Sequence, residues 1–191
     1  MASNTTETLR SVGTKISGKY QHQPLKSPEK EARLLELNPG DISTPLSCKI
    51  HSVDVEDTPL PYEAVSYTWA LQNGDASLSS EISVEPTDTV VMISTSCENM
   101  LRRLRHTIEK RLLWVDMVCI DQSNTGERNH QVGLMKTIYS NSRCVLIDVG
   151  YHPEGVEVFE YLSLDPKKFK QKYGRDIARS NAFRILFSLR W

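Results

Sequence analysis

The stretch that decides the fold runs from residue 112 to 150, LLWVDMVCIDQSNTGERNHQVGLMKTIYSNSRCVLIDVG. Residues 112–120 are almost continuously apolar, which is typical of a strand buried on both faces of a parallel sheet. Residues 144–149 form a second apolar run that Gly150 closes, and they predict another buried strand. The segment between the two runs has helical spacing, so the stretch predicts a βαβ unit with a right-handed connection.

The helix inside this unit is predicted to begin near Asn124. Asn124 and Glu127 have the spacing of a capping box, in which the two side chains satisfy free amides of the first turn. The buried face of the helix is predicted from apolar residues at helical spacing, Val132, Met135 and Ile138 or Tyr139.

A second helix is predicted directly before the stretch. Thr95 and Glu98 repeat the capping-box spacing. The apolar stripe falls at i, i+4, i+7 and i+11, on Cys97, Leu101, Leu104 and Ile108. The basic residues between them favour a solvent-exposed face over a phosphate site, because they interleave with the stripe.

Strands are predicted further upstream. Residues 46–55 alternate apolar and polar side chains, and residues 62–69 are rich in aromatic and β-branched types. Residues 81–84 and 88–93 predict a hairpin. Together with the helices, these strands predict an α/β fold: a doubly wound, mostly parallel sheet flanked by helices, with N-terminal hairpin or strand additions.

The chain is predicted to hold one domain. Residues 1–23 are polar and lack a period, which favours a flexible leader, and residues 24–191 form the domain. Helices are expected at 154–164 and 176–190. The apolar pattern is still running at Trp191, so we expect the domain to be incomplete at its C-terminus.

Composition excludes several classes of function. Lys and Arg number 23 and Asp and Glu 24, a net charge of −1, which argues against a nucleic-acid partner. The chain shows no apolar run of about 20 residues and no signal-peptide pattern, so no membrane span and a cytoplasmic location are expected. The four cysteines form no CxxC pair and are predicted to be buried free thiols. The histidines share no metal-binding spacing, so no metal site is expected.

Three blocks of the sequence resemble the fungal heterokaryon-incompatibility (HET) domain family in order and spacing. They are PLPYEAVSYTWA at 59–70, the stretch 112–150 with its WVDMVCIDQ, ER, QV and IY elements, and, more faintly, PLKSPEKEARLLELNPG at 24–40. A pattern of this length is far more specific than a short motif. Ala70 stands where the family usually has Gly, and Asp148-Val149-Gly150 replaces its usual Trp-Leu-Gly.

The resemblance implies a role in fungal non-self recognition and regulated cell death. HET domains have also been likened to TIR domains, and the strand ending at Ser66-Tyr67 and the loop from Asp121 to Glu127 resemble TIR segments. A TIR-like or flavodoxin-like sheet places ligands at the carboxyl ends of its strands. Some TIR domains cleave NAD, so NAD is implied as a substrate, and the chain is otherwise expected to need no cofactor.

The same analogy implies a set of site residues. A carboxylate can steady the oxocarbenium-like centre formed during NAD cleavage, and Asp121 and Glu127 are the catalytic candidates. The candidates for binding the nucleotide are Ser66, Tyr67, Trp69, Gln122 and Arg128. Alternatives stay open: Glu127 as a helix cap, Arg128 in a surface ion pair, and Asp116 as a structural anchor within an apolar run. The decisive TIR glutamate corresponds to Glu154, Glu157 or Glu160, or to a residue past Trp191.

Two functional interpretations follow from the resemblance. The first is a TIR-like effector that cleaves NAD. The second is a non-catalytic module that associates with itself or with other incompatibility or NLR-like proteins, since 191 residues show no complete catalytic set.

Overall fold

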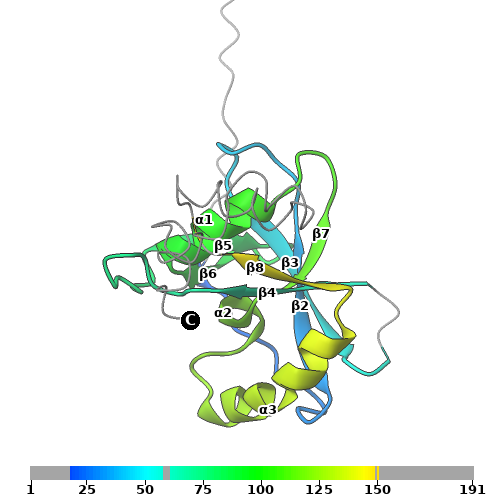
Figure 1. Ribbon diagram of the computed structural model, residues 1–191. Coiled ribbons are helices and arrows are strands. Elements are labelled where there is room, and N and C mark those ends of the chain that lie inside the picture. Colours follow the sequence, from blue (N-terminus) through cyan, green and yellow to red (C-terminus); the bar gives the residue numbers. More distant parts are fainter. Residues whose placement is uncertain (1–17, 58–60, 149, 151–191) are drawn as a thin grey trace, which may run out of the picture.

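A single eight-stranded sheet organises the chain (Figure 1). The structure is a computed structural model and describes residues 18–57, 61–148 and 150. The strand order is β1-β6-β5-β3-β2-β7-β4-β8, and four of the seven strand pairings are parallel. Helix α1 lies on one side of the sheet, and α2 and α3 lie on the other. The predicted α/β class, with a mixed and mostly parallel sheet flanked by helices, is therefore confirmed.

The centre of the sheet is β2 (Glu31–Leu37), which is almost entirely buried. It pairs antiparallel with β3 (Ser47–Asp54) along its whole length and with β7 (Arg111–Trp114) on its other side. Burial on both faces explains why its sequence, EARLLEL, does not alternate cleanly.

The remaining strands lie on either side of this centre. The predicted hairpin is formed by β5 (Ser80–Val84) and β6 (Thr89–Ile93), and β1 (Gly18–Lys19) pairs with β6 at that edge. On the other side β4 (Glu63–Tyr67) lies between β7 and β8 (Cys144–Asp148), parallel to both. The predicted βαβ unit is thus present, with β4 inserted between its two strands.

The strands of that unit differ from the prediction. The strand expected at 112–120 ends at Trp114, and Asp116–Cys119 form the short helix α2. The amides of Val118 and Cys119 both bond to the carbonyl of Val115, which turns the chain away from the sheet. The strand expected to be buried at 144–149 is an edge strand, with Val145 44% and Ile147 60% exposed.

Helix α1 (Thr95–Leu104) is shorter than its apolar stripe suggested. Its N-cap is Ser94, whose side chain accepts from the amide of Cys97, so the prediction of Thr95 as the cap was wrong. The chain leaves the helix at Arg105, and Ile108 is 79% exposed. Arg105, expected to face solvent, is buried and donates to the carbonyls of Thr44 and Pro45.

Helix α3 (Thr125–Asn141) begins as predicted, with the Asn124 side chain accepting from the amide of Glu127. Its buried residues are Glu127, Gln131 and Ile138, whereas Val132 is exposed. The predicted stripe is therefore wrong at Val132, because two polar side chains with tertiary partners occupy the buried face.

Three smaller predictions have mixed outcomes. Cys48, Cys97 and Cys119 are buried thiols, but Cys144 is exposed on β8. Residues 18–23 were assigned to a flexible leader, yet they belong to the fold, since β1 pairs with β6. The helices expected at 154–164 and 176–190 lie outside the described residues. Within the described part of the chain, no helix has the length and hydropathy to cross a membrane.

The end of α1 can be tested with two alanine substitutions. Leu101→Ala removes a fully buried side chain and is expected to lower the free energy of unfolding by about 2–5 kcal/mol. Ile108→Ala removes an exposed side chain and is expected to change it by no more than about 0.5 kcal/mol. Urea denaturation measures both. Equal losses would mean that the helix and its apolar stripe continue to Ile108.

Candidate functional site

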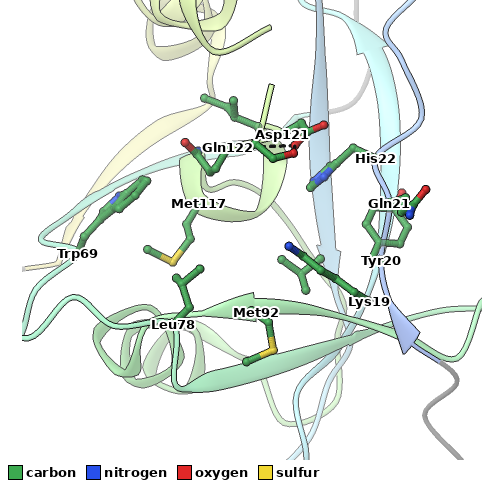
Figure 2. Close-up of a pocket in the computed structure, with 13 residues that line it drawn as sticks. Lys19, Tyr20, Gln21, His22, Trp69, Leu78, Met92, Met117, Asp121 and Gln122 are labelled. Carbon is green, nitrogen blue, oxygen red and sulfur yellow. Dashed lines mark hydrogen bonds between the residues drawn. The ribbon is translucent and has the colours of Figure 1, made fainter. Parts of the chain in front are cut away.

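A cleft of about 400 Å³ opens between the hairpin edge of the sheet and the segment that follows α2 (Figure 2). Its walls come from β1 and the residues after it, from β6, from α2 and from the loop at residues 120–123. The volume falls in the range of small-molecule sites. Three of the seven predicted site residues line it, Trp69, Asp121 and Gln122.

Trp69 forms one end of the cleft and is 36% exposed. Its indole Nε1 donates a hydrogen bond of 2.9 Å to Oδ2 of Asp116. Burial raises the pKa of Asp116 above its usual value, although the bonds from Trp69 and from the amide of Met117 oppose that effect. Asp116 therefore holds the indole ring in place, which agrees with its interpretation as an anchor.

Asp121 lies in the loop after α2 and presents a carboxylate to the cleft. Its Oδ1 accepts from the amide of Ser123 at 3.0 Å and from the Ser123 hydroxyl at 2.6 Å. Burial opposes ionisation, but the bonds from Ser123 and the charge of Arg33 outweigh it and hold the pKa of Asp121 below its usual value. Its Oδ2 has no hydrogen-bond donor among the described residues. Asp121 is thus an ionised acceptor at the rim.

Gln122 shares this rim with Asp121. Its amide Nε2 donates to the backbone carbonyl of Asp116 at 2.9 Å, so its orientation is fixed. The donating end of the amide is occupied, and Oε1 is left to accept a hydrogen bond. Two acceptors from consecutive residues therefore stand at the same edge of the cleft.

Glu127 does not line the cleft. Its carboxylate pairs with the guanidinium of Arg33, and the two side chains are 7% and 2% exposed. Glu127 Oε2 accepts from Arg33 Nη2 at 3.0 Å, and Oε1 also accepts the amide of Asp121 at 2.8 Å. Burial acts against ionisation, yet the Arg33 bond, the Asp121 amide and the Arg33 charge together lower the pKa of Glu127. The carboxylate is ionised and accepts hydrogen bonds from Arg33 and from the amide of Asp121, which links it to the cleft.

The other three predicted residues also lie away from the cleft. Ser66 is in β4 opposite Ile147 of β8. Tyr67 follows it, and burial beside Cys97 and Asp116 raises the pKa of its phenol. Arg128 is exposed on α3, and its guanidinium donates to the carbonyl of Gln122 at 3.4 Å. The structure therefore brings together three of the seven predicted residues and places the other four outside the cleft.

Sequence reasoning missed the wall formed by Lys19, Tyr20 and His22. His22 Nε2 bonds to the carbonyl of Val118 at 2.8 Å, and its ring meets Tyr20 edge to face at 5.1 Å. Burial lowers the pKa of His22, so the imidazole is neutral at pH 7, and Nε2 carries the hydrogen because a carbonyl only accepts. A two-residue strand has no periodicity, so no local signal could have found this wall. Among the described residues no cluster of side chains suits a metal ion.

Comparison with known proteins identifies the family to which the chain belongs. The family model of the heterokaryon incompatibility protein (HET) matches residues 62–184, and the chain belongs to this family. The chain is also similar to heterokaryon incompatibility protein 6, OR allele, of Neurospora crassa, with 34% identity over 143 residues. That match covers 69% of this chain and 20% of the relative, so the chain spans about a fifth of that protein. No solved structure matches significantly. The resemblance to the HET family is confirmed, and the matched residues include the block at 112–150 and most of the block at 59–70.

The buried ion pair can be tested with Glu127→Gln. The change leaves the charge of Arg33 uncompensated and is expected to cost about 3–5 kcal/mol of unfolding free energy at pH 7. Because the folded pKa of Glu127 is lowered, its contribution is complete above the unfolded value of about 4.3 and is lost as the pH falls through the folded pKa. Urea denaturation between pH 7 and 3 should show the gap between wild type and variant closing in that window.

The matched control is Glu98→Gln, which removes the carboxylate of the partly exposed pair with Arg102. It is expected to cost under about 1 kcal/mol. A Glu127→Gln loss no larger than this, or one independent of pH, would contradict the assigned role of the pair.

Proposed function

We propose that this chain is the HET domain of a cytoplasmic protein that acts in fungal non-self recognition, with regulated cell death as the outcome. The family membership and the named relative support this proposal. The cleft is its working site, because it joins the exposed indole of Trp69 to the ionised carboxylate of Asp121 in a space of ligand size. The functional assignment depends on the observation that Trp69 and Asp121 line the same cleft.

The reaction that we propose for the cleft is hydrolysis of NAD between nicotinamide and ribose. Water forms a bond to the ribose carbon, the carbon–nitrogen bond breaks, nicotinamide leaves with the electron pair, and the water proton passes to solvent. Asp121 faces the positive charge that develops on the ribose and stabilises it electrostatically. Trp69 stacks against a ring of the nucleotide, and Gln122 accepts from a ribose hydroxyl.

Glu127 takes a positioning role in this proposal rather than a catalytic one. Its carboxylate is committed to Arg33 and to the amide of Asp121, so it fixes the start of the loop that carries the catalytic carboxylate. Asp116 also has a positioning role, because it accepts the hydrogen bond that fixes the indole of Trp69. Ser66, Tyr67 and Arg128 are not needed for binding in this cleft. The TIR-like character of the domain stays a proposal.

The proposal is tested by Asp121→Asn. The amide keeps an oxygen for the Ser123 bonds but loses the charge, so nicotinamide release from NAD is expected to fall at least about 100-fold, with the thermal unfolding temperature unchanged. Chromatography of the reaction mixture measures the release.

The matched control is Asp41→Asn. Asp41 Oδ1 accepts from the Ser43 amide at 2.8 Å and its hydroxyl at 2.6 Å, the same turn outside the cleft. Asp41→Asn should leave the rate of nicotinamide release unchanged. No nicotinamide release from the wild-type chain, or equal rates in Asp121→Asn and wild type, would refute the enzyme proposal.

A second candidate function is self-association as a non-catalytic module of the same pathway. The observation that favours it is β8, which pairs with β4 on one side and, within the described residues, has no strand on the other. Val145 and Ile147 are exposed on this strand. An exposed apolar edge strand is a template for pairing, here with a second copy of the chain.

This candidate predicts that Ile147→Lys abolishes association. The wild-type chain should show a dimer mass by light scattering at micromolar concentration, and the variant should be a monomer, because a charge at the edge blocks strand pairing. Val132→Lys, an exposed apolar position on α3, is the control and should remain dimeric. A monomeric wild type, or a dimeric Ile147→Lys, would exclude association through β8.

A further inference from the structure

The cleft has a wall that the proposed reaction does not use, formed by Lys19 and the residues that follow it. Lys19 pairs with Val90 of β6, and the amide of Tyr20 donates to the carbonyl of Val90 at 2.7 Å. The His22 ring is bonded to Val118, and the carbonyl of Gln23 accepts from Arg33 at 2.6 Å. Bonds to the sheet, to α2 and to β2 therefore fix the backbone of this wall.

The ammonium group of Lys19 extends from this wall into the cleft (Figure 2). Among residues 18–57, 61–148 and 150, no carboxylate forms an ion pair with it, whereas Lys30 and Lys110 each have one. Three apolar side chains also line the cleft, Leu78, Met92 and Met117. A cation that faces a cleft without a partner is complementary to an anionic group of a ligand.

The opposite rim has the reverse chemistry. Asp121 Oδ2 and Gln122 Oε1 are both acceptors, and neither has a donor among the described residues. Such a pair binds hydroxyl groups, since a diol offers two donors, and it repels an anion. A phosphate is therefore directed to the Lys19 wall and away from this rim.

Trp69 completes the arrangement at its own end of the cleft. Asp116 fixes the edge of the indole, so the ring offers a rigid surface to a planar group. From these three features we infer that the cleft binds a nucleoside 5′-diphosphate in one orientation. The base stacks on Trp69, the ribose diol donates to Asp121 and Gln122, and the phosphates contact Lys19.

The inference rests on the proposed function in one respect, that the ligand of the proposed reaction binds in this cleft. It adds the orientation of the nucleotide between the walls of the cleft, and it assigns recognition of the phosphates to Lys19. It also predicts discrimination: a phosphate on the ribose 2′ position would lie against Asp121, so 2′-phosphorylated nucleotides should bind poorly.

The test is a binding measurement that does not depend on catalysis. The indole N–H resonance of Trp69 in a ¹⁵N-labelled chain, assigned by its loss in Trp69→Phe, reports titration with ADP and with adenosine. Lys19→Gln is expected to weaken ADP binding about 10-fold and to leave adenosine binding unchanged. Lys136→Gln, the same loss of charge on α3 outside the cleft, should match the wild type for both ligands.

Equal ADP affinity in wild type and Lys19→Gln would overturn the inference, and so would equal loss of ADP and adenosine binding. Absence of ADP binding to the wild type would overturn it as well. Matching spectra elsewhere in the chain show that the variant is folded. If ADP binds as expected but no nicotinamide is released from NAD, the inference stands and the proposed reaction fails. If nicotinamide is released but Lys19→Gln binds ADP normally, the reaction stands and the inference fails.

Discussion

The buried pair of Arg33 and Glu127 fixes the relative positions of four segments of the chain. Arg33 comes from the central strand β2 and donates to the carbonyls of Gln23 and Cys119 as well as to Glu127. Glu127 comes from α3 and accepts the amide of Asp121. Withdrawing two charges from water costs several kcal/mol each, and only a complete set of hydrogen bonds offsets that cost. The N-terminal segment, α2 and α3 can therefore pack on β2 in few other ways.

The shape of the cleft depends on the ion pair of Arg33 and Glu127. One wall continues directly into Gln23, and the facing rim begins at Asp121, so both are bonded to the same ion pair. The floor comes from β6, which the sheet holds independently. Movement of either wall would remove a hydrogen-bond partner from a buried charged group, and that loss would lower the stability of the fold. A ligand in this cleft consequently meets groups that are already in position, and binding loses little affinity to ordering them.

Local patterns predicted the parts of the fold that depend on neighbours in sequence. Alternation found β3, apolar runs located β7 and β8, and the capping residue of α3 was found because Asn124 bonds within one turn. The same spacing assigned Glu127 to the cap, but its carboxylate bonds Arg33, 94 residues earlier, and no local pattern encodes that choice. Asp121 and Gln122 were predicted from the TIR analogy as polar residues at the end of an apolar run, and both line the cleft. Lys19 was not, since its strand exists only through pairing with β6.

Asp116 and Asp121 show how one residue type acquires two roles within a single turn of chain. Asp116 is buried, which raises its pKa, although the hydrogen bonds that its oxygens accept from the Trp69 indole and the Met117 amide oppose this effect. Asp121 stands at the rim, where the bonds from Ser123 and the charge of Arg33 lower its pKa. The difference arises because α2 ends between them, turning one carboxylate inward and the other toward the cleft. Sites commonly use paired groups whose environments separate their pKa values in this way. Here one of the two holds the indole of Trp69, and the other faces the cleft.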